Sequence, residues 1–226
     1  MISSMKVLAI APHPDDETLG CGATLLKHKA AGDSLSWLIA TTDYEPQWSK
    51  ELQATKEAEI NTVAAAYGFD RVTRLKFPTV KLDTIPLDEM IGAIRDAIAE
   101  AQPDCVYVNH WGDVHSDHRV VFEATMSVLK PFYSLRNGVK RVLSYEILSS
   151  TDSMPPIAAR SFVPNVFSDV SHHIERKLEI MSLYATEVQP YPLPRAAESI
   201  RALARYRGAT IGAEYAEAFA LMREVV

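Results

Sequence analysis

The sequence lacks the features that mark several large classes of protein. Its 226 residues include only two cysteines, Cys21 and Cys105, and neither belongs to a Cys-x-x-Cys pair, so a disulfide framework is not expected. Lys and Arg total 23 against 29 Asp and Glu, a formal net charge of -6. This balance argues against a surface that binds nucleic acid or anionic membranes. No apolar run approaches the roughly 20 residues that span a bilayer, so stable membrane insertion is not expected either.

The N-terminal residues also lack the marks of a secretory leader. Residues 1–6 run directly into a short apolar stretch, without the longer apolar core and the small-residue cleavage site of a signal peptide. We therefore expect a cytoplasmic protein. The length suffices for a full hydrophobic core, and no repeat, low-complexity tract or flexible linker interrupts the chain. We expect a single domain over residues 1–226.

The chain does contain an alternation of short apolar runs and helical segments. The expected strands cover residues 6–11, 34–41, 71–77, 105–109 and 141–147. The expected helices cover residues 18–31, 51–67, 87–101, a segment that begins near 119, 171–184 and 196–206. Strands that alternate with helices imply parallel βαβ units. The predicted fold is therefore α/β, a Rossmann-like, mostly parallel sheet flanked by helices. The proline-rich last third is expected to form an extension over the active-site end of the sheet.

A dense polar group, His13-Pro14-Asp15-Asp16-Glu17, directly follows the first predicted strand. In open α/β sheets, ligands bind beyond the carboxyl ends of the strands, where this group falls. Its carboxylates repel one another unless a positive charge compensates, and a divalent cation can do so. Histidine and aspartate are also ordinary zinc ligands. The alternative is an acidic turn that caps the next helix, and this group alone favours neither interpretation.

A second polar group, His115-Ser116-Asp117-His118, follows the strand predicted at residues 105–109 after a short loop. In a doubly wound sheet, the first strand and a later one can lie side by side where the strand order reverses. That arrangement would bring the two groups together. A catalytic zinc site uses three protein ligands and keeps one position open, and the two groups can supply three ligands and a spare base. Together they indicate a metal-dependent active site.

These two motifs carry a family resemblance. The run from Ala11 to Gly22 together with the run from His115 to Arg119 closely resembles the PIG-L/LmbE-like deacetylases, and the similarity extends over most of the chain. The resemblance implies an LmbE-like α/β fold. It also implies a zinc-dependent hydrolase that removes the N-acetyl group from an N-acetylglucosamine-type sugar or glycoconjugate. A small-molecule amino-sugar substrate and a homo-oligomer, a trimer or hexamer, are further expectations from the family.

The resemblance also implies roles for individual residues. The positions that match the family's zinc ligands are His13, Asp16 and His118. Asp15 matches the general base, and His115 matches a residue that assists, when protonated, as acid or oxyanion stabiliser. Asp117 matches a residue that orients a histidine, which metal sites commonly need. Whether Asp15 or His115 protonates the leaving amine stays open.

Substrate contacts are predicted at three further positions: Lys56, Trp111 and Arg195. Lys56 falls where many relatives have arginine, and lysine lacks the planar fork that grips carboxylates or paired hydroxyls. Leu193 departs from the His-Pro-Arg run of many relatives, although Arg195 is present. Trp111 could stack on a sugar face, with a core aromatic as the alternative. The identity of the sugar and its aglycone therefore stays open.

Other classes of function fit less well. A dinucleotide-binding domain would need a Gly-x-Gly-x-x-Gly turn after the first strand, where this chain has carboxylates that would repel a pyrophosphate. A non-catalytic sugar-binding relative is a second alternative, but a binding protein has no need for Asp15. A zinc amidase of the same family that acts on a thiol conjugate is the third.

Overall fold

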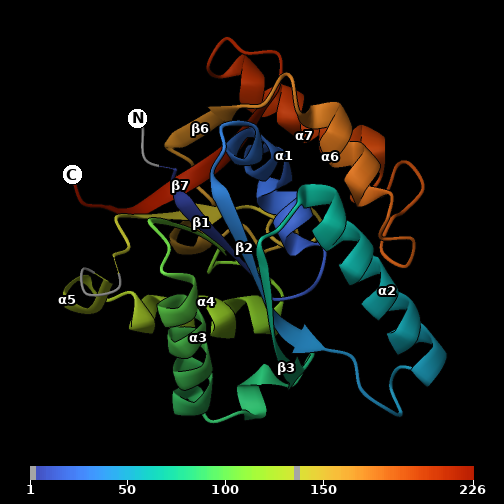
Figure 1. Cartoon of the computed structure of the whole chain (residues 1–226). Coiled ribbons are helices and arrows are strands. Elements are labelled where there is room, and N and C mark those ends of the chain that lie inside the picture. The colour runs from blue at the N-terminus through green and yellow to red at the C-terminus, as the bar shows by residue number, and fades with distance from the viewer. Residues whose placement is uncertain (1–3, 135–137) are drawn as a thin grey trace.

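The computed structural model describes residues 4–134 and 138–226, and this part of the chain contains a seven-stranded sheet (Figure 1). The single domain predicted over 1–226 includes residues 1–3 and 135–137, which lie outside the described residues. The strand order is β3-β2-β1-β4-β5-β7-β6. The strands are β1 (Lys6–Ala11), β2 (Ser34–Thr42), β3 (Arg71–Pro78), β4 (Cys105–Asn109), β5 (Arg141–Tyr145), β6 (Val166–Asp169) and β7 (Ala216–Glu224).

Helices cover both faces of this sheet. Residues of α1, α2, α6 and α7 pack in one hydrophobic core, and residues of α3 and α4 pack in the other. The helices are α1 (Asp16–Ala30), α2 (Lys50–Tyr67), α3 (Leu87–Ala101), α4 (Ser116–Val128), α5 (Pro131–Ser134), α6 (Ile174–Met181) and α7 (Ala197–Ala209). Short 3₁₀ turns cover Leu82–Thr84 and Ala158–Arg160. None of these helices is both long and apolar enough to cross a membrane.

Strand β1 shows why the central strands are apolar throughout. Val7, Ala9 and Ala11 belong to the core under α1 and α2. Leu8 and Ile10 belong to the core under α3 and α4. Because successive side chains of a strand point to opposite faces, a strand covered on both faces needs an unbroken apolar run. The predicted α/β fold with a mostly parallel sheet is confirmed.

The last third of the chain extends the sheet as well as covering its end. Strand β7 pairs antiparallel with β5, and β6 pairs antiparallel with β7. The sequence analysis missed both strands. Strand β6 has four residues and is only partly buried, while the charges at Glu217, Arg223 and Glu224 flank the apolar run of β7. Because β6 is short and lacks a clean alternation, and because these charges bound the apolar run of β7, neither segment was predicted as a strand.

The order of the strands reverses at β1, which pairs in parallel with β2 on one side and with β4 on the other. The chain leaves β1 toward α1 on one face of the sheet and leaves β4 toward α4 on the other face. The loops after these two strands therefore meet at the carboxyl edge of the sheet, where α/β proteins bind ligands. Helix α4 begins at Ser116 rather than near Arg119, so His118 lies in its first turn.

Helix α1 lies unusually close to its neighbours because of the Gly20-Cys21-Gly22 run. A Cβ atom at Gly20 would come within 2.0 Å of Cδ2 of Tyr145, and one at Gly22 within 2.3 Å of the Tyr67 hydroxyl oxygen. Two buried tyrosines occupy the space that side chains would otherwise need. This close packing sets the position of the N-terminus of α1, which carries Asp16.

Candidate functional site

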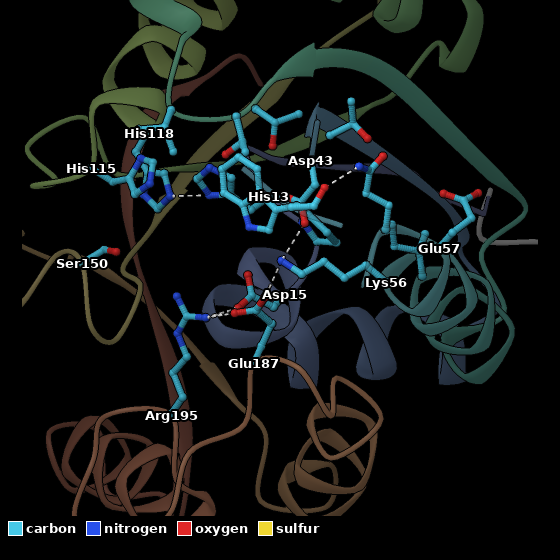
Figure 2. A pocket seen from close by; sticks show the side chains of 18 residues that line it. His13, Asp15, Asp43, Lys56, Glu57, His115, His118, Ser150, Glu187 and Arg195 are labelled. Atoms are coloured by element: carbon cyan, nitrogen blue, oxygen red, sulfur yellow. Dashed lines mark hydrogen bonds and ion pairs between the residues drawn. The ribbon is translucent and has the colours of Figure 1, made fainter. Parts of the chain in front are cut away.

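Three side chains from the two predicted motifs, those of His13, Asp16 and His118, converge at the carboxyl edge of the sheet. Figure 2 shows two of them, His13 and His118. Nδ1 of His13 lies 3.2 Å from Oδ2 of Asp16. Nε2 of His118 lies 3.3 Å from the same oxygen and 3.2 Å from Nδ1 of His13. One oxygen and two ring nitrogens thus form a nearly equilateral triangle.

The dimensions of this triangle fit a zinc ion. Tetrahedral zinc with bonds of about 2.0–2.1 Å to nitrogen and oxygen has ligand atoms roughly 3.3 Å apart. The three distances between His13, Asp16 and His118 match this spacing. His115 is a further possible donor, because the ligand atoms of His13, His115 and His118 all lie within 4.8 Å of one another. The predicted ligand set is therefore brought together, with His115 beside it.

Each of the two histidines of the triangle has a carboxylate at its other ring nitrogen. Oδ2 of Asp117 lies 3.0 Å from Nε2 of His13, and Oδ2 of Asp113 lies 3.0 Å from Nδ1 of His118. Such carboxylate–histidine pairs set the ring orientation and raise the basicity of a metal ligand. The orienting role predicted for Asp117 agrees with this geometry. The contact between Asp113 and His118 was not predicted, although the place of Asp113 in the loop before His115 was a signal for it.

The electrostatics of the site favour bound positive charge. Burial lowers the pKa of His13, but bonds to Asp117 and Asp16 outweigh it and raise the pKa to about 9. Burial also lowers the pKa of His118, but Asp16 and Asp113 raise it to about 10. Without a metal ion, these raised pKa values favour the protonated forms of His13 and His118 at neutral pH. A divalent cation would displace those protons and take over their neutralising role.

Asp15 is positioned by a strained backbone. Its φ is 122°, in a region that non-glycine residues rarely adopt, and it forms the N-cap of α1. Its side chain is buried, and Oδ2 accepts a hydrogen bond of 2.8 Å from Nη1 of Arg195. Burial and the neighbouring Asp16 raise the pKa of Asp15 well above its usual value, while Arg195 opposes them. This buried carboxylate lines the same cavity as His13 and His118.

The surroundings of His115 favour its neutral form near pH 7. Burial and the neighbouring His13 and His118 lower its pKa to about 4, which differs from the protonated form expected from the family. Its Nδ1 accepts a hydrogen bond of 3.2 Å from the backbone N–H of Asp117, so the proton of the neutral ring lies on Nε2. His115 can therefore still donate a hydrogen bond at its other nitrogen.

A cavity of about 210 Å³ opens beside the histidines. Two of the three predicted substrate contacts, Lys56 and Arg195, line it, but Trp111 does not. Trp111 is 37% exposed, and its ring centroid lies 6.1 Å from that of His110. Trp48 lines the cavity instead. Sequence reasoning missed Trp48, which lies in a loop between β2 and α2 that carried no metal-binding motif.

The segment that holds both motifs matches a known protein family. Residues 8–129 match the model of the family described as PIG-L: GlcNAc-PI de-N-acetylase. The matched segment contains both polar motifs, most of β1, and strands β2, β3 and β4. It ends before the segment that supplies Glu187 and Arg195.

Individual relatives cover more of the chain. The uncharacterized deacetylase YaiS of Escherichia coli (strain K12) is 28% identical over 169 residues, which are 73% of this chain and 81% of that protein. Among solved structures, the conserved protein TT1542 of Thermus thermophilus is 26% identical with a TM-score of 0.78, covering 98% of this chain and 96% of that one. The N,N'-diacetylchitobiose deacetylase of Pyrococcus horikoshii is 22% identical with a TM-score of 0.75, covering 98% and 85%. At that last identity the likeness shows the fold.

Proposed function

Because this chain belongs to the GlcNAc-PI de-N-acetylase (PIG-L) family of deacetylases, we propose that it is a zinc-dependent hydrolase that removes the N-acetyl group from an N-acetylglucosamine-type sugar or glycoconjugate. The observation that carries the proposal is the triangle of ligand atoms from His13, Asp16 and His118, with sides of 3.2–3.3 Å. These three residues would hold the ion, and Asp117 and Asp113 would orient the two histidines.

When bound, zinc supplies a Lewis acid that polarises the acetyl carbonyl and makes water a stronger nucleophile at neutral pH. Asp15 is suited to accept the proton of the attacking water. It lines the cavity, it is not part of the ligand triangle, and its burial favours the protonated form that results. The water oxygen bonds to the acetyl carbon, the C–N bond breaks, and acetate and a free sugar amine are formed.

The amine needs a proton as the C–N bond breaks, and we assign its delivery to Asp15. His115 is neutral near pH 7 and has no second proton to transfer at that pH. Its Nε2–H is instead available as a hydrogen-bond donor to the oxyanion that develops on the acetyl oxygen. Asp15 thus returns the proton that it took from water, and His115 stabilises charge.

The test is an amine-release assay over a panel of N-acetylglucosamine conjugates, with the protein loaded with zinc and after removal of zinc. We expect free amine and acetate in equal amounts from at least one conjugate, and loss of this activity with the metal. Metal content is measured on the same samples by elemental analysis. If fully zinc-loaded protein released no amine from any conjugate, the proposed activity would be wrong.

A further inference from the structure

Five charged side chains form a continuous row along the wall of the cavity (Figure 2). Oδ2 of Asp15 lies 2.8 Å from Nη1 of Arg195, and the same nitrogen lies 2.6 Å from Oε2 of Glu187. Oε1 of Glu187 lies 2.9 Å from Nζ of Lys56. Lys56 Nζ lies 3.1 Å from Oδ2 of Asp43. The row thus alternates in sign from Asp15 to Asp43, and we refer to it as the charged row.

The charged row is a partly buried section of the cavity wall and not a set of exposed surface ion pairs. The side chains of its members are between 3% and 23% exposed. They come from four separate segments: the turn before α1, the end of β2, helix α2 and the loop between α6 and α7. Partly buried pairs are screened less by solvent and salt than exposed ones, so the charges of this wall act on a bound ligand.

The balance of charge in this wall disfavours an anionic ligand. Among the residues that line the cavity, the carboxylates are Asp15, Asp43, Glu57 and Glu187, and the Lys and Arg side chains are Lys56 and Arg195. Each of these two cations already contacts two carboxylates. An added carboxylate would therefore find both cations engaged and would face Glu187 and Asp43. The hydroxyl groups of a sugar can instead accept from the cations and donate to the carboxylates.

Glu187 is the residue on which this balance depends. It is shared by both cations, with Oε1 on Lys56 and Oε2 on Arg195. If its charge were removed, Lys56 would keep Asp43 and Arg195 would keep Asp15. Lys56 and Arg195 would then each have one carboxylate partner instead of two, and both could bind an anionic group of a ligand.

We propose that the charged row makes this enzyme selective for N-acetylglucosamine conjugates with a neutral aglycone over those with an anionic one, and that Glu187 determines this selectivity. The proposal rests on the proposed function for the sugar and for the placement of its acetyl group at the metal site. The part of the substrate beyond the acetyl group then faces the charged row. Like charges placed together across an interface are a common means of rejecting a wrong partner.

The test measures binding, so that it does not depend on turnover. Zinc-loaded protein is titrated calorimetrically with two glucosamine glycosides that carry the free amine of the product. One has a carboxylate at the end of its aglycone, and the other has the matching primary amide. We expect the dissociation constant of the amide to be roughly tenfold lower. Equal affinities, or tighter binding of the carboxylate, would overturn the proposal.

A charge-removing variant then tests the role of Glu187. Glu187→Gln should bring the two dissociation constants to within about twofold of each other, because Lys56 and Arg195 each lose one carboxylate partner. Glu179→Gln, on α6, is the control: it removes an exposed carboxylate that pairs with Arg176 and should leave the tenfold preference unchanged. If Glu187→Gln weakened both ligands equally, Glu187 would have only a structural role and its assignment would be wrong.

Amine release is measured separately with the acetylated forms of the same two glycosides. Absence of hydrolysis together with a retained preference for the amide would contradict the proposed function and leave the charge selectivity standing. Hydrolysis of both compounds together with equal binding of the amide and the carboxylate would support the proposed function and contradict the charge selectivity. The two proposals therefore fail in distinguishable ways.

Discussion

Helix α1 contacts two clusters of buried charge that differ in what completes them. Halfway along the helix, Nζ of Lys177 lies 2.7 Å from Oε1 of Glu217, and both side chains are 4% exposed. Lys177 also donates to the Leu19 carbonyl oxygen. The Glu217 carboxylate accepts from the backbone N–H groups of Ala23 and Thr24 at 3.0 and 2.7 Å. The protein thus supplies the counter-charge of each member of this pair.

The cluster at the N-terminus of α1 is built from similar groups but is not balanced in the same way. Three carboxylates, those of Asp16, Asp113 and Asp117, lie against two histidines, and they raise the pKa values of those histidines to about 9 and 10. The histidines supply positive charge only while they carry extra protons. In the first cluster Lys177 neutralises the buried carboxylate. The second cluster lies beside a cavity and is suited to bind an exchangeable cation.

This comparison teaches how a structural charge pair can be told from a functional one. Both clusters contact helix α1 and both are buried, so burial alone does not distinguish a structural cluster from a functional one. Two features distinguish them: whether the carboxylates are neutralised by a permanently charged side chain, and whether the cluster lies beside a cavity. The predictions below test the two clusters against each other, from the largest expected effect to the smallest.

Replacing a predicted metal ligand should have the largest effect. His118→Ala removes one corner of the ligand triangle, so we expect bound zinc to fall to near zero and amine release to be lost. The fold should persist, because the Lys177–Glu217 cluster is untouched. Elemental analysis and far-ultraviolet circular dichroism check the two parts. A variant that kept a full complement of zinc would show that the ligand assignment is wrong.

Asp15→Asn should separate chemistry from metal binding. The amide keeps nearly the same shape but cannot take a proton from water, so turnover should fall by about 10²–10⁴-fold, as for a lost general base. Zinc content should stay at the wild-type level, because Asp15 is not part of the triangle. Asp16→Asn is the matched comparison and should weaken zinc binding itself, since a neutral amide is a poorer ligand. Loss of zinc from Asp15→Asn would remove the distinction between the two neighbours.

Lys177→Met should act on stability and not on the metal. It leaves the Glu217 carboxylate buried without its counter-charge, and breaking such a pair costs about 3–5 kcal/mol of unfolding free energy. Urea unfolding of zinc-loaded protein measures this loss, and zinc content per folded chain should be unchanged.

The control for this measurement is Arg176→Met, which breaks the exposed pair with Glu179 and should cost less than about 1 kcal/mol. If Lys177→Met behaved like this surface change, the mid-helix pair would contribute little and the contrast between the clusters would be weaker than argued.

The smallest expected effect is at an orienting carboxylate. Asp113→Asn keeps a polar partner beside Nδ1 of His118 but removes its charge, so we expect zinc affinity to fall by about 10–100-fold. Competition with a chelator of known affinity measures this change. Asp152→Asn, at an exposed position in the segment after β5, should leave the affinity at the wild-type value. An unchanged affinity in Asp113→Asn would limit the orienting role to Asp117.

Much of this architecture follows from the sequence alone. The apolar runs of β1 and β4, buried on both faces, need no distant information to be identified as strands, and Gly68 ends α2 with a left-handed φ of 68°. The two His- and Asp-rich motifs are short enough that spacing and residue type already indicate a metal site. The family resemblance predicted His13, Asp16 and His118 as ligands and Asp15 as the base, and these roles stay predictions. The contact between Asp117 and His13 agrees with the predicted orienting role.

Tertiary structure alone decided the rest, because the remaining contacts join residues that are far apart in the chain. The order of the strands determines that Asp117 reaches His13 and that Glu187 reaches Lys56. It also places Trp48 rather than Trp111 beside the cavity, and it turns Arg195 toward Asp15. Nothing in the sequence predicted that Glu217 is buried, and its contacts with Lys177 and the backbone of α1 explain that burial. Local patterns determine strands, helices and motifs, whereas the partner of a buried charge depends on which segments the sheet brings side by side.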